Sequence, residues 1–522
     1  MSILVKIKSF LTGDYFKISL LAAFIFWIIY PLSNSINFYQ NDDWIYYKTI
    51  QQFLTGDYVM PGYIEALFYT QGFLGTVYAY LFGLDKLPVL TLIISILTFY
   101  IFAITIRKHY LNNFKDTALV SIMLLISPLY IYSTLGFMSD MYFLFFVAIS
   151  IFFIEEFLKE YKYKDFIFLN LAIVIGFFVR QLSIIVGFAF FLILLFKRKY
   201  KWAIAQLISS VSLFLAYLYL VPKTRTMEKH QNLLFENLLN PSYIFTTTYV
   251  GVIYAIMTIL PLTILIISKF IKTRPGLLKS GLFILSSLVV YFLFSYLFNP
   301  SNTTNPNFYY LKNTVDKKGF FTGTSLGQKY GLMYEQEIYY YFELITKITL
   351  AFFITSIIFY IKRSLNFYSI FIILYLGFMT VLGGGLYDRY YLTLIPVAIL
   401  FILNLAKEFN YITRFLSVIS ILIVSFYSYN FAMEFVILNN NIWDTSKEVS
   451  QKTDTSYKRI QAGNAWNRTY YNDKFDKYRF SFEKRETDPE IKCCFKLYDT
   501  VEVNFVFNMF NDSKIYLYKR DY

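Results

Sequence analysis

The sequence has 522 residues, of which 57% are hydrophobic and only 16% are charged, and its mean hydropathy is +0.49. This composition is too apolar for a soluble protein of this length, and it indicates a membrane protein. The formal net charge of +14 could suit a nucleic-acid partner, but the basic residues lie mainly in short loops between apolar runs, as topology signals do. Nucleic acid is therefore set aside, and membrane lipids are the expected surroundings.

Apolar runs of roughly 18 to 22 residues recur along most of the chain, and each can cross a bilayer core of about 30 Å as a helix. Helices are expected because they satisfy their own backbone polar groups in lipid. The first span is expected to be retained, because no cleavage pattern accompanies it. About thirteen spans are predicted, at 17–36, 87–106, 117–137, 141–158, 166–179, 182–196, 201–221, 244–268, 281–298, 344–361, 366–385, 390–406 and 413–432.

The loop charges predict the orientation. Loops that would share the side of the N-terminus carry clusters of Lys and Arg, so that side is expected to be cytoplasmic; the clusters lie at 107–108, 159–164, 197–199, 269–274 and 362–363. The loops 37–86 and 299–343 and the tail would then lie outside the cell, at the plasma (inner) membrane. If the two half-length spans around Arg180 form one helix instead, the tail moves inside.

The pattern changes after residue 432. Residues 1–432 are expected to form the transmembrane domain, and residues 433–522 a small extracytoplasmic domain of α/β or β-rich structure. VEVNFVF (501–507) alternates apolar and polar residues as a half-buried strand does, and KIYLYKR (514–520) is its expected partner. Trp466 is interpreted either as core packing or as a sugar-stacking residue. The adjacent Cys493 and Cys494 are not expected to form an ordinary disulfide with each other.

Two adjacent carboxylates, Asp42 and Asp43, follow the first span. The residues after them alternate apolar and polar types in an approximate helical stripe, which predicts an amphipathic helix on the outer membrane surface. Breaks at 56–57 and 61–62 separate it from a second amphipathic segment that ends at 82–83. The acidic pair either caps the first of these helices, or supplies a general base whose pKa is raised by its neighbour and by burial.

This arrangement resembles the first outer loop of the GT-C membrane glycosyltransferases, and is most similar to the protein O-mannosyltransferase and lipid A aminoarabinose transferase branch. The resembling parts are the acidic pair, the GD-x-x-x-P element at 56–61 and the segment ending at 82–83. SPLYIYSTLGFMSD (127–140) and GLYDRYYLTLIP (385–396) follow in the family's order. The resemblance implies a GT-C-like fold: an all-α polytopic membrane protein with amphipathic outer-face helices.

The resemblance also implies roles for the acidic residues. Asp42 takes the place of the family's general base, and Asp43 that of an orienting or metal-directed neighbour. Asp140 takes the place of a second outer acidic residue, although it could equally be an N-cap of the fourth span.

The cationic candidates are Arg389, Arg180 and the neighbouring Gln181. Arg389 would bind the donor phosphate, for which a permanently charged, bidentate guanidinium is suited; the alternative is a snorkelling interfacial arginine. Arg180 lies between two apolar half-spans, where a charge is costly and marks a functional pocket unless it is a structural pair. Gln71–Gly72 stands where close relatives in the aminoarabinose branch carry a lysine followed by prolines, which leaves a phosphate contact there open.

The implied function is transfer of a hexosyl or pentosyl group from a polyprenyl-phosphate sugar donor to a lipid, glycan or protein acceptor, with inversion, on the outer face. A flippase or transporter of lipid-linked oligosaccharides and an O-antigen polymerase or ligase are the alternatives. With two histidines in the sequence, His109 and His230, no histidine-rich metal site is expected, and a carboxylate-bound Mg²⁺ or Mn²⁺ stays open. The loop 299–343, with glycine hinges at 319, 323 and 327, is interpreted either as a lid or as a plain connector.

Overall fold

The computed structural model describes most of the chain, as the ranges 13–40, 42–61, 64, 67–224, 235–241, 244, 259, 261–262, 265, 276–297, 315–316, 319–320, 336–359, 365–381, 388–407, 409–470, 476–481, 489–507 and 514–521. His230, most of the predicted span 244–268 and most of the predicted loop 299–343 lie outside these residues, so the predictions made for them stay predictions.

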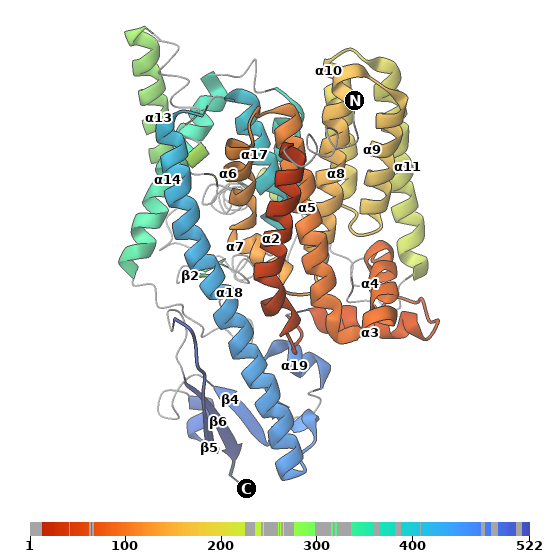
Figure 1. The fold of residues 1–522 in the computed structure, drawn as a ribbon, viewed down its shortest axis with the longest axis vertical. Coiled ribbons are helices and arrows are strands. Elements are labelled where there is room, and N and C mark those ends of the chain that lie inside the picture. Colours follow the sequence, from red (N-terminus) through yellow and green to blue (C-terminus); the bar gives the residue numbers. More distant parts are fainter. Residues whose placement is uncertain are drawn as a thin grey trace, which may run out of the picture.

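Helices form most of the described structure (Figure 1). In chain order they are α2 (Asp14–Asn34), α3 (Asp43–Leu54), α4 (Tyr69–Phe82), η1 (Leu84–Lys86), α5 (Leu87–His109), α6 (Phe114–Leu125), α7 (Pro128–Thr134), α8 (Ser139–Glu160), α9 (Tyr163–Phe177), α10 (Ser183–Phe196), α11 (Tyr200–Thr224), η2 (Phe235–Leu239), α13 (Leu277–Leu297), α14 (Gln336–Phe359), α16 (Phe367–Val381), η5 (Asp388–Thr393), α17 (Leu394–Leu405), α18 (Tyr411–Thr453), η6 (Tyr457–Arg459), α19 (Asn464–Thr469) and α20 (Pro489–Lys492).

Within the described residues, five helices are long and apolar enough to cross a membrane. They are Asp14–Asn34, Leu84–His109, Ser139–Glu160, Tyr200–Leu220 and Tyr411–Thr453. The bent pair α6 and α7 could make a sixth, and several other apolar helices have only 10–17 residues. A multi-pass membrane protein is therefore supported, but the predicted count of about thirteen spans is not confirmed.

The predicted span 117–137 is divided into α6 and α7, whose axes differ by 68°. Pro128 opens α7, and a proline removes a backbone donor and disfavours a helical residue before it. The helix therefore ends before the proline, and the chain that follows reaches the start of α8 through a turn at 135–138.

The loops lie at two opposite ends of the bundle. At one end, ion pairs join Arg107 to Asp14 (2.7 Å), Lys108 to Glu156 (2.6 Å) and Arg414 to Asp116 (2.7 Å). These contacts bring together helix ends on the side that the basic loops predict to be shared with the N-terminus. At the other end, Asn37 donates to Asp444 over 2.8 Å, so the loop 37–86 contacts the base of the C-terminal domain, as the topology predicts.

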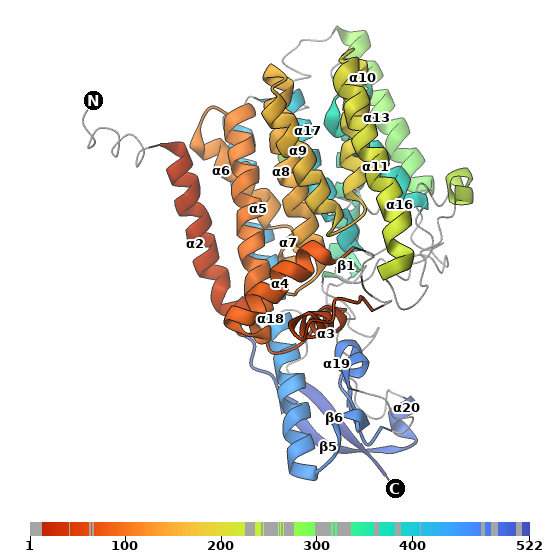
Figure 2. The ribbon, with the colours of Figure 1, turned by 90° about the vertical axis from the view of Figure 1, so that its right-hand side faces the viewer.

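The helices α3 and α4 lie across this second end, between the bundle and the C-terminal domain (Figure 2). Helices are thus present at both predicted positions, and α3 buries Ile45, Ile50 and Phe53 as an amphipathic helix would, whereas α4 buries Gln71 and exposes apolar side chains, so the prediction of an amphipathic second segment was wrong in its pattern. The helix α4 turns another face outward, on which Phe73 and Tyr80 are 67% and 80% exposed. It ends at Gly83, whose φ of +96° favours glycine.

The C-terminal domain contains a four-stranded sheet of order β3-β4-β6-β5, formed by β3 (Ile460–Gln461), β4 (Tyr478–Ser481), β5 (Phe495–Glu502) and β6 (Lys514–Arg520). β3 pairs with β4 in parallel, and the other pairs are antiparallel. The predicted pairing with 514–520 is confirmed, but the partner strand begins at Phe495 and ends at Glu502, so the prediction of 501–507 was wrong in its bounds. The predicted boundary at 433 falls inside the unbroken helix α18.

The interpretation of Trp466 as a core residue is confirmed. Its side chain is completely buried and packs edge-on against Trp443 of α18 at a ring-centroid distance of 5.0 Å. Tyr457 and Tyr470 contact the same ring. The sheet domain is therefore joined to α18 by a buried aromatic cluster.

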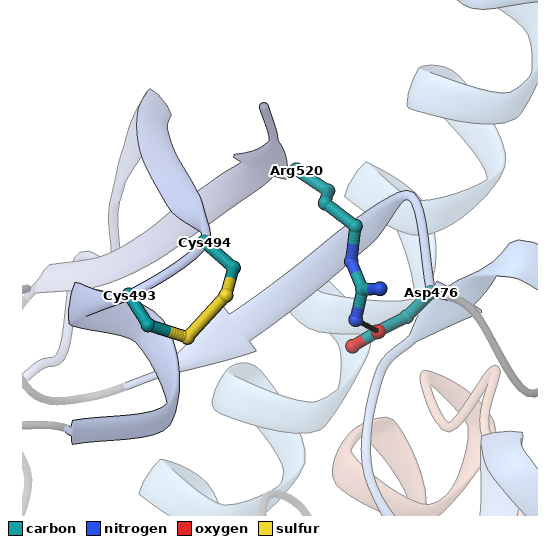
Figure 3. The surroundings of a disulfide bond; sticks show 4 residues. All are labelled: Asp476, Cys493, Cys494 and Arg520. Atoms are coloured by element: carbon teal, nitrogen blue, oxygen red, sulfur yellow. Dashed lines mark hydrogen bonds and ion pairs between the residues drawn. A yellow bond between two sulfur atoms is a disulfide. The ribbon is translucent and has the colours of Figure 1, made fainter. Parts of the chain in front are cut away.

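The expectation for the two cysteines was wrong. Cys493 and Cys494 form a disulfide with each other in the turn between α20 and β5 (Figure 3). The local chain is anchored nearby, because Asp521 N–H donates to the Cys494 carbonyl oxygen (3.0 Å) and Arg520 pairs with Asp476 (2.7 Å). Adjacent cysteines need an unusual turn to pair, and this turn is bonded by Asp521, 27 residues after Cys494, a contact that the local sequence does not reveal.

Replacing Trp466 by Ala is expected to destabilise the C-terminal domain by about 3–5 kcal/mol, because a large buried ring leaves a cavity. A lower midpoint of thermal unfolding in detergent, followed by tryptophan fluorescence, measures this loss. Leu497→Ala, at a side chain that is 54% exposed in the same domain, is the control and should leave the midpoint nearly unchanged. Equal midpoints for the two variants would contradict the assignment of Trp466 to the core.

Candidate active site

Asp42 and Arg389 are far apart in the sequence and in contact in the structure. Arg389 Nη2 donates to Asp42 Oδ2 over 3.2 Å. Arg389 Nε lies 3.5 Å from Asp140 Oδ2, and Arg180 Nη1 donates to Asp140 Oδ1 over 2.9 Å. Four groups therefore form a chain of alternating charge, which we call the charge chain: Asp42, Arg389, Asp140 and Arg180.

Each member of the charge chain comes from a different part of the bundle. Asp42 directly precedes α3, and Asp140 lies in the first turn of α8. Arg180 lies in the turn between α9 and α10, and Arg389 lies in η5. All four positions lie at or beside element ends, and because Asp42 directly precedes α3 and the four groups are in contact, they lie next to the helix that crosses this end of the bundle; α3 is seen there in Figure 2.

The charge chain has one exposed end. The Asp42 side chain is 40% exposed, whereas the side chains of Arg389, Asp140 and Arg180 are only 4%, 2% and 3% exposed. A buried charge is costly unless a counter-charge faces it, and the alternation supplies a counter-charge for each of these groups. Asp42 is therefore the member of the chain that a substrate in water can reach.

Two residues that the sequence did not point to complete the surroundings of the guanidinium groups. Ser139 Oγ accepts a hydrogen bond from Arg180 Nε (2.8 Å). The ring of Tyr390 lies 4.9 Å from the Arg180 guanidinium carbon and 5.8 Å from that of Arg389, within the range of cation–π attraction. Both residues adjoin a predicted site residue in the chain, and that adjacency is the signal by which they could have been found.

The site also includes Gln181, beside Arg180 in the same turn. Its Oε1 atom is buried and, among the described residues, has no hydrogen-bond partner. Gln181 is thus next to the charge chain through its neighbour Arg180, and its predicted role toward the donor phosphate stays a prediction.

Asp43 has a different environment from Asp42. Its side chain is 1% exposed, and Oδ2 accepts a hydrogen bond from the N–H of Phe137 over 2.7 Å. Burial raises the pKa of Asp43 to about 8, although the Phe137 N–H and the charge of Arg389 act in the opposite direction. Asp43 therefore faces the main chain of the turn before α8, which suits the predicted orienting role.

The carboxylates do not form a metal-binding group. Among the described residues, no three or more His, Cys, Asp or Glu side chains are placed to hold a metal ion. Asp42 and Asp140 already face guanidinium groups, and Asp43 faces a backbone N–H. These carboxylates thus already face positive charge or a backbone donor, and the Mg²⁺ or Mn²⁺ that the sequence left open stays a prediction.

Comparison with known proteins bears on this site. Residues 73–223 match the protein family described as dolichyl-phosphate-mannose-protein mannosyltransferase. That family belongs to the GT-C class, so this segment is similar to a GT-C family domain. No curated protein and no solved structure was found to match the chain. The resemblance to the GT-C glycosyltransferases is therefore confirmed for these residues.

The matched segment runs from α4 into α11 and contains Asp140, Arg180 and Gln181. Asp42, Asp43 and Arg389 lie outside it. The fold brings them to it, since Arg389 and Asp140 pair directly and Asp43 bonds the main chain at Phe137. The site is thus completed by residues on both sides of the matched segment in the sequence.

The raised pKa of Asp43 predicts a pH dependence of stability. Because the folded protein holds this proton more tightly than the unfolded chain, the contribution is fully present below about pH 4 and is lost as the pH rises through about 8. The loss is at most about 6 kcal/mol. Asp43→Asn keeps an oxygen for the Phe137 N–H and removes the titration, so its unfolding midpoint should fall less between pH 4.5 and 8.5 than that of the wild type.

The control for this comparison is Asp57→Asn. Asp57 is an exposed carboxylate in the same loop that also accepts a backbone N–H, from Val59 over 3.1 Å. This variant should keep the wild-type slope. Parallel midpoint-against-pH curves for wild type and Asp43→Asn would show that Asp43 does not titrate as described.

Proposed function

We propose that this protein is a membrane glycosyltransferase that moves a sugar from a polyprenyl-phosphate donor to an acceptor at the end of the bundle crossed by α3 and α4. The observation that carries the proposal is the contact of Asp42 with Arg389, because it places a reachable carboxylate beside a buried guanidinium. The match of residues 73–223 to a family of mannosyltransferases supports the same class of reaction. Mannose on a dolichyl-type phosphate is accordingly the donor to try first.

In this proposal Asp42 is the general base. Its carboxylate takes the proton of an acceptor hydroxyl or amide, and the acceptor atom attacks the anomeric carbon of the sugar. The bond from that carbon to the phosphate oxygen breaks, and its electron pair leaves with the polyprenyl phosphate. Direct displacement inverts the anomeric centre, and general-base help contributes roughly 10²- to 10⁴-fold in rate.

The guanidinium groups stabilise the departing phosphate. A phosphate oxygen bound at Arg389 Nη2 takes the place that Asp42 Oδ2 holds there, which leaves the carboxylate free to accept a proton. Arg180 lies behind, on the far side of Asp140, and adds positive charge to the same region. A well-placed donor of this kind contributes about 3 kcal/mol to transition-state stabilisation.

The orientation expected from the loop charges supports an extracytoplasmic site. The site lies at the end opposite to the basic loops that contain Arg107, Lys108 and Arg414, and the positive-inside rule assigns such loops to the cytoplasm. A donor carried by a lipid enters from the bilayer, so no nucleotide is needed outside the cell. The N-terminus would then be cytoplasmic and the C-terminal domain extracytoplasmic.

Asp42→Asn should lower sugar transfer by at least about 100-fold while the protein still folds, because the base is lost and its exposed position tolerates the amide. Transfer from synthetic polyprenyl-phosphate mannose to acceptors in membranes containing the protein, read as labelled product, measures this. Thermal unfolding in detergent checks the fold.

Asp57→Asn, the same substitution at an exposed acid of the same loop, is the matched control and should retain transfer. Full transfer by Asp42→Asn would rule out the proposed base. A lipid-linked sugar carried across vesicles by both wild type and Asp42→Asn, without new glycosidic product, would favour a transporter instead.

A further inference from the structure

The main chain at Phe137 is held from both sides by side chains of the loop 37–86. Asp43 Oδ2 accepts from the Phe137 N–H over 2.7 Å, and Gln71 Nε2 donates to the Phe137 carbonyl oxygen over 2.8 Å. Gln71 is completely buried, and Asp43 is nearly so. Losing either partner would leave a buried backbone group unsatisfied, which is costly.

Close packing fixes the same turn one residue earlier. A Cβ atom on Gly136 would lie 2.5 Å from Asp43 Oδ2 and closer still to Gln40 Oε1. Gln40 itself donates from Nε2 to the carbonyl oxygen of Tyr132 over 3.0 Å. A glycine at 136 therefore lets two polar side chains of the loop approach the main chain directly.

The ring of Phe137 is anchored as well. It is completely buried and lies edge-on to Tyr47 of α3 and to Phe68 at the start of α4, with ring centroids 6.1 and 6.2 Å apart. A Cβ atom on Gly75 of α4 would lie 2.6 Å from the tip of this ring. Backbone and side chain of Phe137 are thus fixed by one loop.

The turn leads directly to the charge chain. Ser139 and Asp140 follow Phe137 by two and three residues and open α8. Arg180 donates to both of them, and Arg389 pairs with Asp140. A displacement of the turn therefore moves Asp140 relative to both guanidinium groups.

We propose that Gln71 is a positioning residue of the enzyme: by holding the Phe137 carbonyl it keeps Asp140 in place between Arg180 and Arg389. Its effect on sugar transfer rests on the proposed function, and its effect on the turn does not. Gln71 stands where the resembled branch has a lysine, but here the side-chain amide donates its hydrogen bond to the Phe137 carbonyl oxygen. It acts through the turn and through Asp140, and it need not touch the substrate.

The variant Gln71→Glu tests this with a pH profile. A protonated carboxyl donates an O–H to the Phe137 carbonyl, whereas a carboxylate repels it, and burial raises the pKa of such a group above its usual range. Relative to wild type, transfer from synthetic polyprenyl-phosphate mannose should be close to normal near pH 5. It should fall by about 100-fold as the pH rises to 8–9, as expected for misplaced reacting groups.

Gln51→Glu is the matched control, because Gln51 is exposed on α3 and the same charge is introduced in the same loop. It should follow the wild-type pH profile. Gln71→Met, of similar length and uncharged, should lower transfer at every pH, and it serves as the second variant if Gln71→Glu does not fold. A wild-type profile for Gln71→Glu, or undiminished transfer by Gln71→Met, would overturn the proposal.

Amide hydrogen exchange of peptides covering 135–142 in the full-length protein measures the turn without any substrate. Exchange should be faster in Gln71→Met, and in Gln71→Glu at pH 8 but not near pH 5, after correction for the intrinsic pH dependence. Unchanged exchange would overturn the proposal whatever the activity. If the wild type transfers no sugar, the proposed function fails, and the exchange data alone then decide whether Gln71 holds the turn.

Discussion

The carboxylate of Asp140, buried between two guanidinium groups, is the interaction on which the geometry of the site depends. Arg180 reaches it from the turn between α9 and α10, and Arg389 from η5. Removing one partner of a buried pair leaves an uncompensated charge and commonly costs 3–5 kcal/mol. The three segments must therefore meet for any of them to bury its charge. This requirement fixes the arrangement of the irregular chain at these helix ends.

In the proposed function, the difference in exposure among the charged groups gives them different chemical roles. The two arginines and Asp140 are shielded from water, where electrostatic attraction is strong, whereas Asp42 lies at the water-accessible end of the charge chain. Proton transfer requires access to an acceptor, and stabilisation of a leaving phosphate requires a fixed positive charge. Along the charge chain, the group proposed to accept a proton is thus exposed, and the groups proposed to stabilise the phosphate are buried. Asp43, adjacent in sequence to Asp42, points into the protein and belongs to the support of the site.

The sequence could predict the features that depend on residues close together in the chain. The helices α3 and α4 follow from periodicity and from glycine and proline breaks, and Arg180 was singled out by the cost of a charge between apolar segments. The partner of Asp43 lies 94 residues away, and the turn that pairs Cys493 with Cys494 is bonded by Asp521, just after β6. Nothing in the local pattern encodes such contacts. Pro128 is a sequence signal for the break between α6 and α7, but the apolar run around it favoured the prediction of one continuous span.

The helix α18 carries a mechanical implication. It has 43 residues, or about 65 Å at 1.5 Å per residue, about twice the thickness of a bilayer core. Arg414 ties its first turn to Asp116 at one end, and Trp443 packs on Trp466 near the other. Such a helix is stiff, so its length sets the distance between the sheet and the Asp116 end of the bundle. An insertion or deletion in α18 between these two anchors would therefore change that distance, and a change of less than one turn would also rotate the sheet about the helix axis.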